Sequence, residues 1–90
     1  MTLDARFYFA NLGADVARCI SAARADDDVR YQRSSARARA TIGHLRNAHR
    51  PGAYEEALLL MRGLVYARES GNLETFESQL NKIIGAFAPV

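Results

Sequence analysis

Apolar residues recur along the chain at intervals of three and four positions, the spacing that places side chains on one face of an α-helix. Four such segments follow one another with short breaks between them. This pattern predicts an all-α fold, an antiparallel four-helix bundle built from two helical hairpins. The predicted helices cover residues 3–24, 28–48, 53–69 and 73–87.

The breaks between these segments contain residues that favour helix ends. The three aspartates at 26–28 suit an N-cap and the first turn of a helix, where free N–H groups and the positive end of the helix dipole lie. The Arg-Pro-Gly sequence at 50–52 interrupts the chain, because proline disfavours helical geometry in the residue before it. Gly71 suits the position after a helix, and Asn72 suits the N-cap of the last one. With 90 residues, the chain is expected to form a single helical domain over residues 1–90.

Each predicted helix has a face for the core. On the first helix this face holds Phe9, Leu12, Val16, Ile20 and Ala23, with Cys19 at its border. The second helix contributes Tyr31, Ser35, Ala38, Ile42 and Leu45. The third contributes Tyr54, Leu58, Met61 and Val65, widened by Ala57 and Leu64. The fourth contributes Leu73, Phe76, Leu80, Ile83 or Ile84, and Phe87. The second face is thin where Ser35 and Ala38 lie, so a neighbouring helix must approach closely there or fill the space with a large side chain.

Two of the predicted helices carry more apolar surface than one core requires. The first has a second stripe at four-three spacing and only a narrow polar face, which holds Asp4, Asn11, Asp15 and Arg18. The third has Leu59 and Tyr66 outside its core face, seven residues apart. This surplus predicts an interface, and a homodimer, made by Phe7, Ala10, Ala14, Ala17, Leu59 and Tyr66. The alternative is that the first helix lies centrally and contacts several helices of its own chain.

Charge is unevenly distributed, although the net charge is only +2. Residues 29–50 contain six arginines and no acid. Such a helix can neutralise nucleic-acid phosphates, and the candidate residues for this alternative are Arg30, Arg33, Arg37, Arg39 and Arg46. The competing interpretation pairs these arginines with acids on neighbouring helices. Because the segment has only one aromatic residue, Tyr31, base stacking is not supported.

Several functional classes find no support in the chain. One cysteine forms no internal disulfide and no zinc framework, and it suits a reducing compartment, so we expect a cytoplasmic protein. The longest aliphatic run is far shorter than the roughly 20 residues that span a bilayer, so no membrane association is expected. The chain has no glycine-rich phosphate loop and no nucleophile elbow. We therefore expect no enzyme activity, no metal and no cofactor.

The predicted function is that of a non-catalytic helical protein–protein interaction module, adaptor or chaperone-like, which forms a homodimer. The alternatives are a nucleic-acid-binding protein that uses the arginine-rich second helix, and a structural subunit of a larger assembly. The hairpins are similar in style to those of small helical secretion chaperones and tetratricopeptide repeats. The Trp and Leu-Gly signature of the latter is absent, so no family is assigned.

Overall fold

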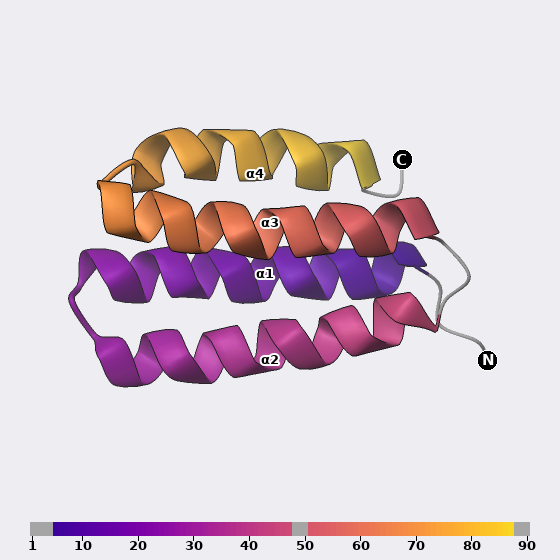
Figure 1. The fold of residues 1–90 in the computed structure, drawn as a ribbon, viewed down its shortest axis with the longest axis horizontal. Coiled ribbons are helices and arrows are strands. Elements are labelled where there is room, and N and C mark those ends of the chain that lie inside the picture. Colours follow the sequence, from indigo (N-terminus) through magenta and orange to yellow (C-terminus); the bar gives the residue numbers. More distant parts are fainter. Residues whose placement is uncertain (1–4, 48–50, 88–90) are drawn as a thin grey trace.

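The computed structural model describes the backbone of residues 5–47 and 51–87 and the side chains of residues 7–47 and 52–82, and it confirms an all-α four-helix bundle. Helices α1 (Ala5–Arg24), α2 (Asp28–Arg46), α3 (Pro51–Ser70) and α4 (Leu73–Phe87) run antiparallel in sequence order (Figure 1). Residues 3, 4 and 48 of the predicted helices lie outside the described residues. Helix α3 begins two residues earlier than predicted, because proline is well accommodated in the first turn of a helix.

The helices are not equivalent in their neighbours. Within the described part of the chain, α1 and α3 each contact the other three helices, whereas α2 and α4 do not contact each other. The helices α1 and α3 therefore face each other across the short diagonal of the bundle. Their outward sides, which lie opposite their buried residues, point in opposite directions.

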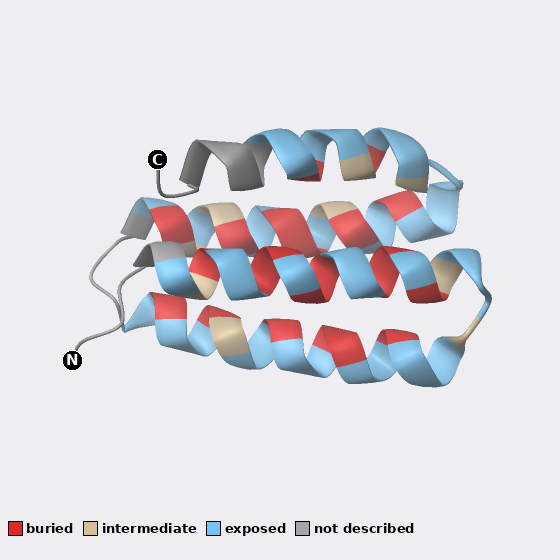
Figure 2. Ribbon diagram, turned by 180° about the vertical axis from the view of Figure 1, so that it is seen from behind, coloured by how far each residue is buried: buried red, intermediate tan, exposed pale blue. Residues whose placement is uncertain are grey.

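One hydrophobic cluster takes residues from all four helices. On α1 and α2 it contains most of the predicted face, and Figure 2 shows buried residues recurring along these helices. The small residues Ser34, Ser35 and Ala38 of α2 are all buried. They let α1 approach closely, and α1 packs more extensively against α2 than against either other helix. On α4, Phe76 and Leu80 are buried as predicted.

The predicted core face of α3 is partly wrong. Leu58 and Val65 are 39% and 41% exposed, so they do not belong to the core. The core instead takes a neighbouring strip of the helix, which holds Ala53, Ala57, Leu60, Met61, Leu64 and Ala67. This strip combines large residues with three alanines, and small side chains let α3 lie close to its three neighbours. The rotation turns Leu60 and Ala67 inward, although neither belongs to the predicted core face.

Asp15 was also placed wrongly by the pattern, since it lies in the core boundary rather than on a solvated face. It is only 7% exposed. Its Oδ1 lies 2.9 Å from a guanidinium nitrogen of Arg18, and 3.5 Å from Nε of Arg37 on α2. A buried carboxylate is stable only with such partners, and the Arg37–Asp15 pair is of the kind expected by the interpretation that paired these arginines with acids on neighbouring helices.

The turn between α1 and α2 uses its aspartates in different ways. Asp27 is the N-cap of α2, since its side chain accepts a hydrogen bond from the Arg30 amide at 3.1 Å. Asp26 instead terminates α1 in the left-handed region, with φ +56°. The Asp27 amide donates to the Ala22 carbonyl at 2.8 Å, as in a Schellman motif. Gly71 has the same role after α3, as predicted, with φ +78°.

The strain at Asp26 gives a testable prediction. We expect Asp26→Gly to stabilise the protein by about 0.5 to 1 kcal/mol, because glycine adopts positive φ without a steric cost. This gain is net of the greater flexibility that glycine gives the unfolded chain. Urea unfolding followed by circular dichroism measures the change. Asp27→Gly is the matched control, and it should not stabilise the protein, because it removes the N-cap side chain.

Candidate interaction surfaces

The outward side of α3 exposes the largest group of apolar side chains among the described residues. Leu59 and Tyr66 are 60% and 70% exposed, in agreement with their predicted place outside the core. Leu58 and Val65 lie on the same side, at 39% and 41% exposure. Four large apolar residues on one face of one helix form a candidate interaction surface, which we call the α3 outer face.

Charged residues run down the middle of the α3 outer face. Glu55, Arg62 and Glu69 are each exposed and follow one another at seven-residue spacing, which is close to two helical turns. None of the three forms an ion pair with another residue that the structure describes. The face therefore combines apolar area with three charges that are free to pair with a partner.

Shallow depressions flank the α3 outer face. One, of about 360 Å³, lies on the α2 side between Arg39, Arg62, Val65 and Tyr66. Another, of about 370 Å³, lies on the α4 side, and Tyr66, Phe76 and Gln79 line it. A third, of about 220 Å³, is lined by Glu55, Leu58, Leu59 and Arg62. The side chains of this face and the hollows beside it thus form ridges and grooves. Helices pack together by fitting the ridges of one into the grooves of the other.

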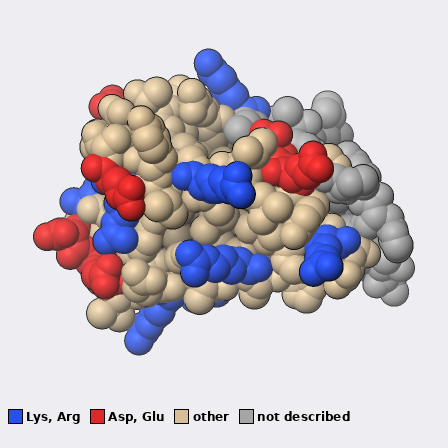
Figure 3. Space-filling model, in the orientation of Figure 1, with Lys and Arg blue, Asp and Glu red and all other residues tan. Residues whose placement is uncertain are grey.

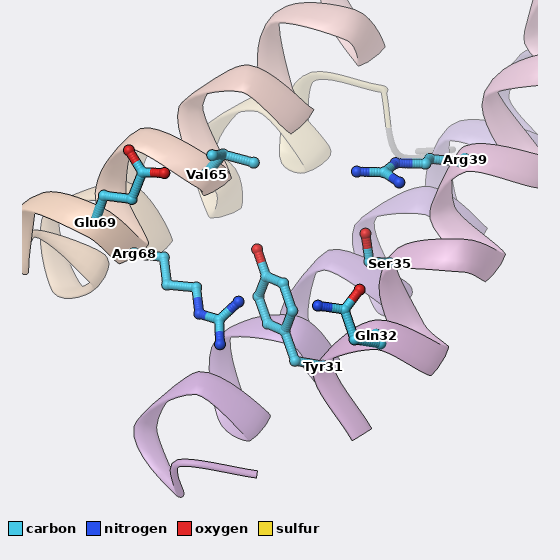
Figure 4. Close-up of a pocket in the computed structure, with 7 residues that line it drawn as sticks. All are labelled: Tyr31, Gln32, Ser35, Arg39, Val65, Arg68 and Glu69. Carbon is cyan, nitrogen blue, oxygen red and sulfur yellow. The ribbon is translucent and has the colours of Figure 1, made fainter. Parts of the chain in front are cut away.

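A groove of about 410 Å³ separates α2 from α3 next to this face (Figure 4). The groove exists because Ser35 is too small to fill the space between the two helices. Ser35 belongs to the part of the α2 face that was predicted to be thin. Arg39 and Tyr31 border it from α2, and Val65 borders it from α3. Figure 4 shows the Tyr31 hydroxyl and the Arg39 guanidinium directed toward the open space.

One end of the groove is held together by polar contacts between α2 and α3. The Arg68 guanidinium lies 3.8 Å from the centre of the Tyr31 ring, a cation–π contact. It also donates a 3.1 Å hydrogen bond to Asp28, which closes the start of α2 against the end of α3. Burial raises the pKa of the Tyr31 hydroxyl above its usual value. Arg68 therefore has a structural role at this end of the groove.

The predicted stripe on α1 is exposed as well. Phe7 is 47% exposed, and Ala10, Ala14 and Ala17 are classed as exposed. The stripe lies opposite the buried side of α1, so it faces away from the α3 outer face. The structure therefore does not bring the six predicted interface residues together: Phe7 and the three alanines lie on one side of the bundle, and Leu59 and Tyr66 lie on the other.

The five candidate arginines of α2 do not form one continuous surface. Arg37 lies toward α1, where it pairs with Asp15, and Arg30 lies 3.9 Å from Asp27. Arg39 borders the groove on the opposite, α3 side of the helix. Within the described chain Arg33, Arg39 and Arg46 form no ion pair, and Arg50 lies outside it. On the face shown in Figure 3 the basic side chains are separated rather than merged into a patch.

Cys19 is buried in the core, as its place on α1 predicted. Its Sγ lies 3.9 Å from the Tyr31 carbonyl oxygen, to which the thiol donates. Burial, reinforced by the negative charge of Asp15, raises the pKa of the Cys19 thiol to about 11. A thiol in this state is a poor nucleophile.

Sequence reasoning missed Leu58 and Val65 as members of the surface, because it assigned them to the core. The signal that could have found them is the spacing of Glu55, Leu58, Leu59, Arg62, Val65, Tyr66 and Glu69, which describes one complete helix face. Among the described residues no group of three His, Cys, Asp or Glu side chains could hold a metal ion. None of the described helices is long and apolar enough to cross a membrane.

Comparison with models of known protein families, with curated proteins and with solved structures gives no match to this chain. The fold places it in the class of all-α four-helix bundles. A functional proposal must therefore rest on the surfaces of the protein.

Proposed function

We propose that the protein is a non-catalytic helical interaction module, an adaptor or chaperone-like binder, that uses the α3 outer face and associates with itself through it. The observation that carries this proposal is the exposure of Leu58, Leu59, Val65 and Tyr66 on one side of one helix. A protein of this size cannot bury all of its apolar surface internally. The single reduced thiol suits the cytoplasm as the place of action.

The energy available at this face is sufficient for specific binding. Covering a few hundred Å² of apolar surface contributes about 25 cal/mol for each Å², which is several kcal/mol before the cost of association. Tyr66 is the most exposed of the large apolar side chains that the structure describes. Tyrosine is enriched among residues that dominate binding energy, because it combines a large apolar body with a polar tip.

Two alternative functions have less support from the surfaces of the protein. Arg33, Arg39 and Arg46 are available for phosphate, so the protein could bind nucleic acid, but only Arg39 and Arg46 share a side of α2, and Arg33 lies on another. Binding that falls steeply with added salt would support this alternative. A structural subunit of a larger assembly would use the α1 stripe and the α3 outer face together, since the two point in opposite directions.

Two matched substitutions test the proposed function. Leu59→Glu places a charge in the α3 outer face, and Ala14→Glu places the same charge in the α1 stripe. Light scattering at high protein concentration should show that Leu59→Glu abolishes association and that Ala14→Glu leaves it intact. In affinity capture, a protein retained by the unmodified chain and lost with Leu59→Glu would also support the face as an interaction surface. If Leu59→Glu changes neither the mass nor the captured proteins, the proposal is wrong.

A further inference from the structure

The order of residues on the α3 outer face is informative about its partner. The face reads Glu55, then Leu58 and Leu59, then Arg62, then Val65 and Tyr66, then Glu69. An acidic, a basic and an acidic residue thus alternate at seven-residue spacing, with one apolar pair between each. None of these charges is paired within the described chain. They can therefore form ion pairs with a second helix whose charges alternate in the complementary order.

We infer that the partner is a second copy of this chain, which packs its α3 antiparallel against α3 of the first and places Glu55 opposite Arg62 of the second copy. This inference rests on the proposed function, because it gives the orientation and register of the self-association through the α3 outer face. A two-fold axis relates the copies, so the same contact occurs twice, with Arg62 of the first copy opposite Glu55 of the second.

Charge order disfavours two competing arrangements of the α3 helices. A parallel pair of α3 helices places each charge against its own copy. An antiparallel pair centred on Arg62 places Arg62 against itself and Glu55 against Glu69. Like charges held face to face weaken association. Among arrangements that align the charges, two antiparallel registers remain, one with Glu55 opposite Arg62 and one with Arg62 opposite Glu69.

The length of the helix favours the first of these registers. With Glu55 opposite Arg62, residues 51–66 of both copies overlap, whereas the other register overlaps only residues 61–70 of α3. The first register also places Leu58 level with Leu59 of the second copy, so that apolar side chains meet between the two ion pairs. These residues line the depression of about 220 Å³, which offers space to the side chains of the other copy.

The interface is small, so the dimer is expected to be weak. Sixteen overlapping residues extend about 24 Å along the helix, and one helix from each copy buries less than a standard interface of about 1,600 Å². We expect a dissociation constant on the order of 10 to 100 µM. Added salt screens the two ion pairs and weakens the dimer only in part, because the leucine contact remains.

Charge reversal tests the register directly. Glu55→Arg and Arg62→Glu each place like charges face to face, so each variant alone should dimerise at least about tenfold more weakly than the unmodified chain. When the two variants are mixed, the arginine introduced at position 55 faces the glutamate introduced at position 62. The native Arg62 of one copy also faces the native Glu55 of the other. Native mass spectrometry and sedimentation should therefore show a heterodimer with an affinity within about threefold of the unmodified dimer.

The control is Glu69→Arg, which lies outside the overlap and should leave dimerisation unchanged. Circular dichroism checks that every variant remains folded. If Arg62→Glu associates with Glu69→Arg instead of with Glu55→Arg, or if the single reversals have no effect, the inferred register is wrong. If the unmodified chain stays monomeric, self-association is wrong, and capture of another protein that depends on Leu59 would then support only the α3 outer face as a binding surface.

Discussion

Replacing Leu64 by alanine is expected to destabilise the bundle by about 2 to 5 kcal/mol. Leu64 is fully buried in the α3 strip that faces the core. Its truncation removes buried apolar atoms and leaves a cavity between packed helices, and both effects lower the free energy of unfolding. Because small domains have only about 5 to 15 kcal/mol of stability, we expect the melting temperature to fall by about 10 °C or more. Thermal and urea unfolding followed by circular dichroism measure both quantities.

The same substitution on the other side of α3 is the matched control. Leu59 is 60% exposed, so Leu59→Ala should change the free energy of unfolding by less than about 0.5 kcal/mol when the protein is dilute and monomeric. At high concentration it should weaken association, because association stabilises the folded state. Equal losses of stability from Leu64→Ala and Leu59→Ala in dilute solution would show that α3 is rotated from the orientation described.

The second large effect concerns Cys19. The native thiol should react with an aromatic disulfide reagent at about pH 8 at least about 100 times more slowly than the thiol of the unfolded chain. The fully buried position blocks access, and a pKa of about 11 leaves little of the reactive thiolate at that pH. The reagent's absorbance, followed with and without urea, gives the two rates. Rapid labelling of the folded protein would contradict the burial of Cys19.

The raised pKa of Cys19 makes the free energy of unfolding fall at alkaline pH. In the unfolded chain the thiol has its ordinary pKa of 9.0, whereas in the folded protein the pKa is about 11, so the folded state holds this proton more tightly. The contribution of the protonated Cys19 thiol to the free energy of unfolding is therefore fully present below pH 9 and is lost as the pH rises toward 11. At pH 10 the loss is about 1 kcal/mol. Tyr31, whose pKa is also raised, acts in the same direction. The variant Cys19→Ala should lose less stability than the unmodified chain between pH 8 and 10.

Periodicity predicted the helices well because apolar spacing and helix-end residues acted together. The Gly71–Asn72 sequence terminates α3 at Ser70, one residue later than predicted, and α4 starts at the predicted residue, Leu73. The buried faces of α1 and α2 were also largely predicted, since most of the large apolar residues of each helix lie in one row at helical spacing. Asp26 could not be predicted as a helix terminator, because three consecutive aspartates offered similar local chemistry and only the path of the chain selects among them.

The orientation of α3 could not be read from spacing. The helix has two apolar rows, one through Leu60 and Leu64 and one through Leu58 and Val65, and both fit a helical period. The inward row is chosen by how closely α1, α2 and α4 can approach, which depends on residues far away in the sequence. The burial of Asp15 has the same origin, since it requires Arg37 from α2.

The most direct test of self-association through α3 is the mass of the unmodified chain in solution. Sedimentation equilibrium over about 5 to 500 µM protein covers the expected dissociation constant. The mass should rise with concentration from 10.0 kDa toward twice that value, and most of the rise should persist at high salt. A constant mass of 10.0 kDa over the whole range would contradict self-association, and the α3 outer face would then be a site for a different protein.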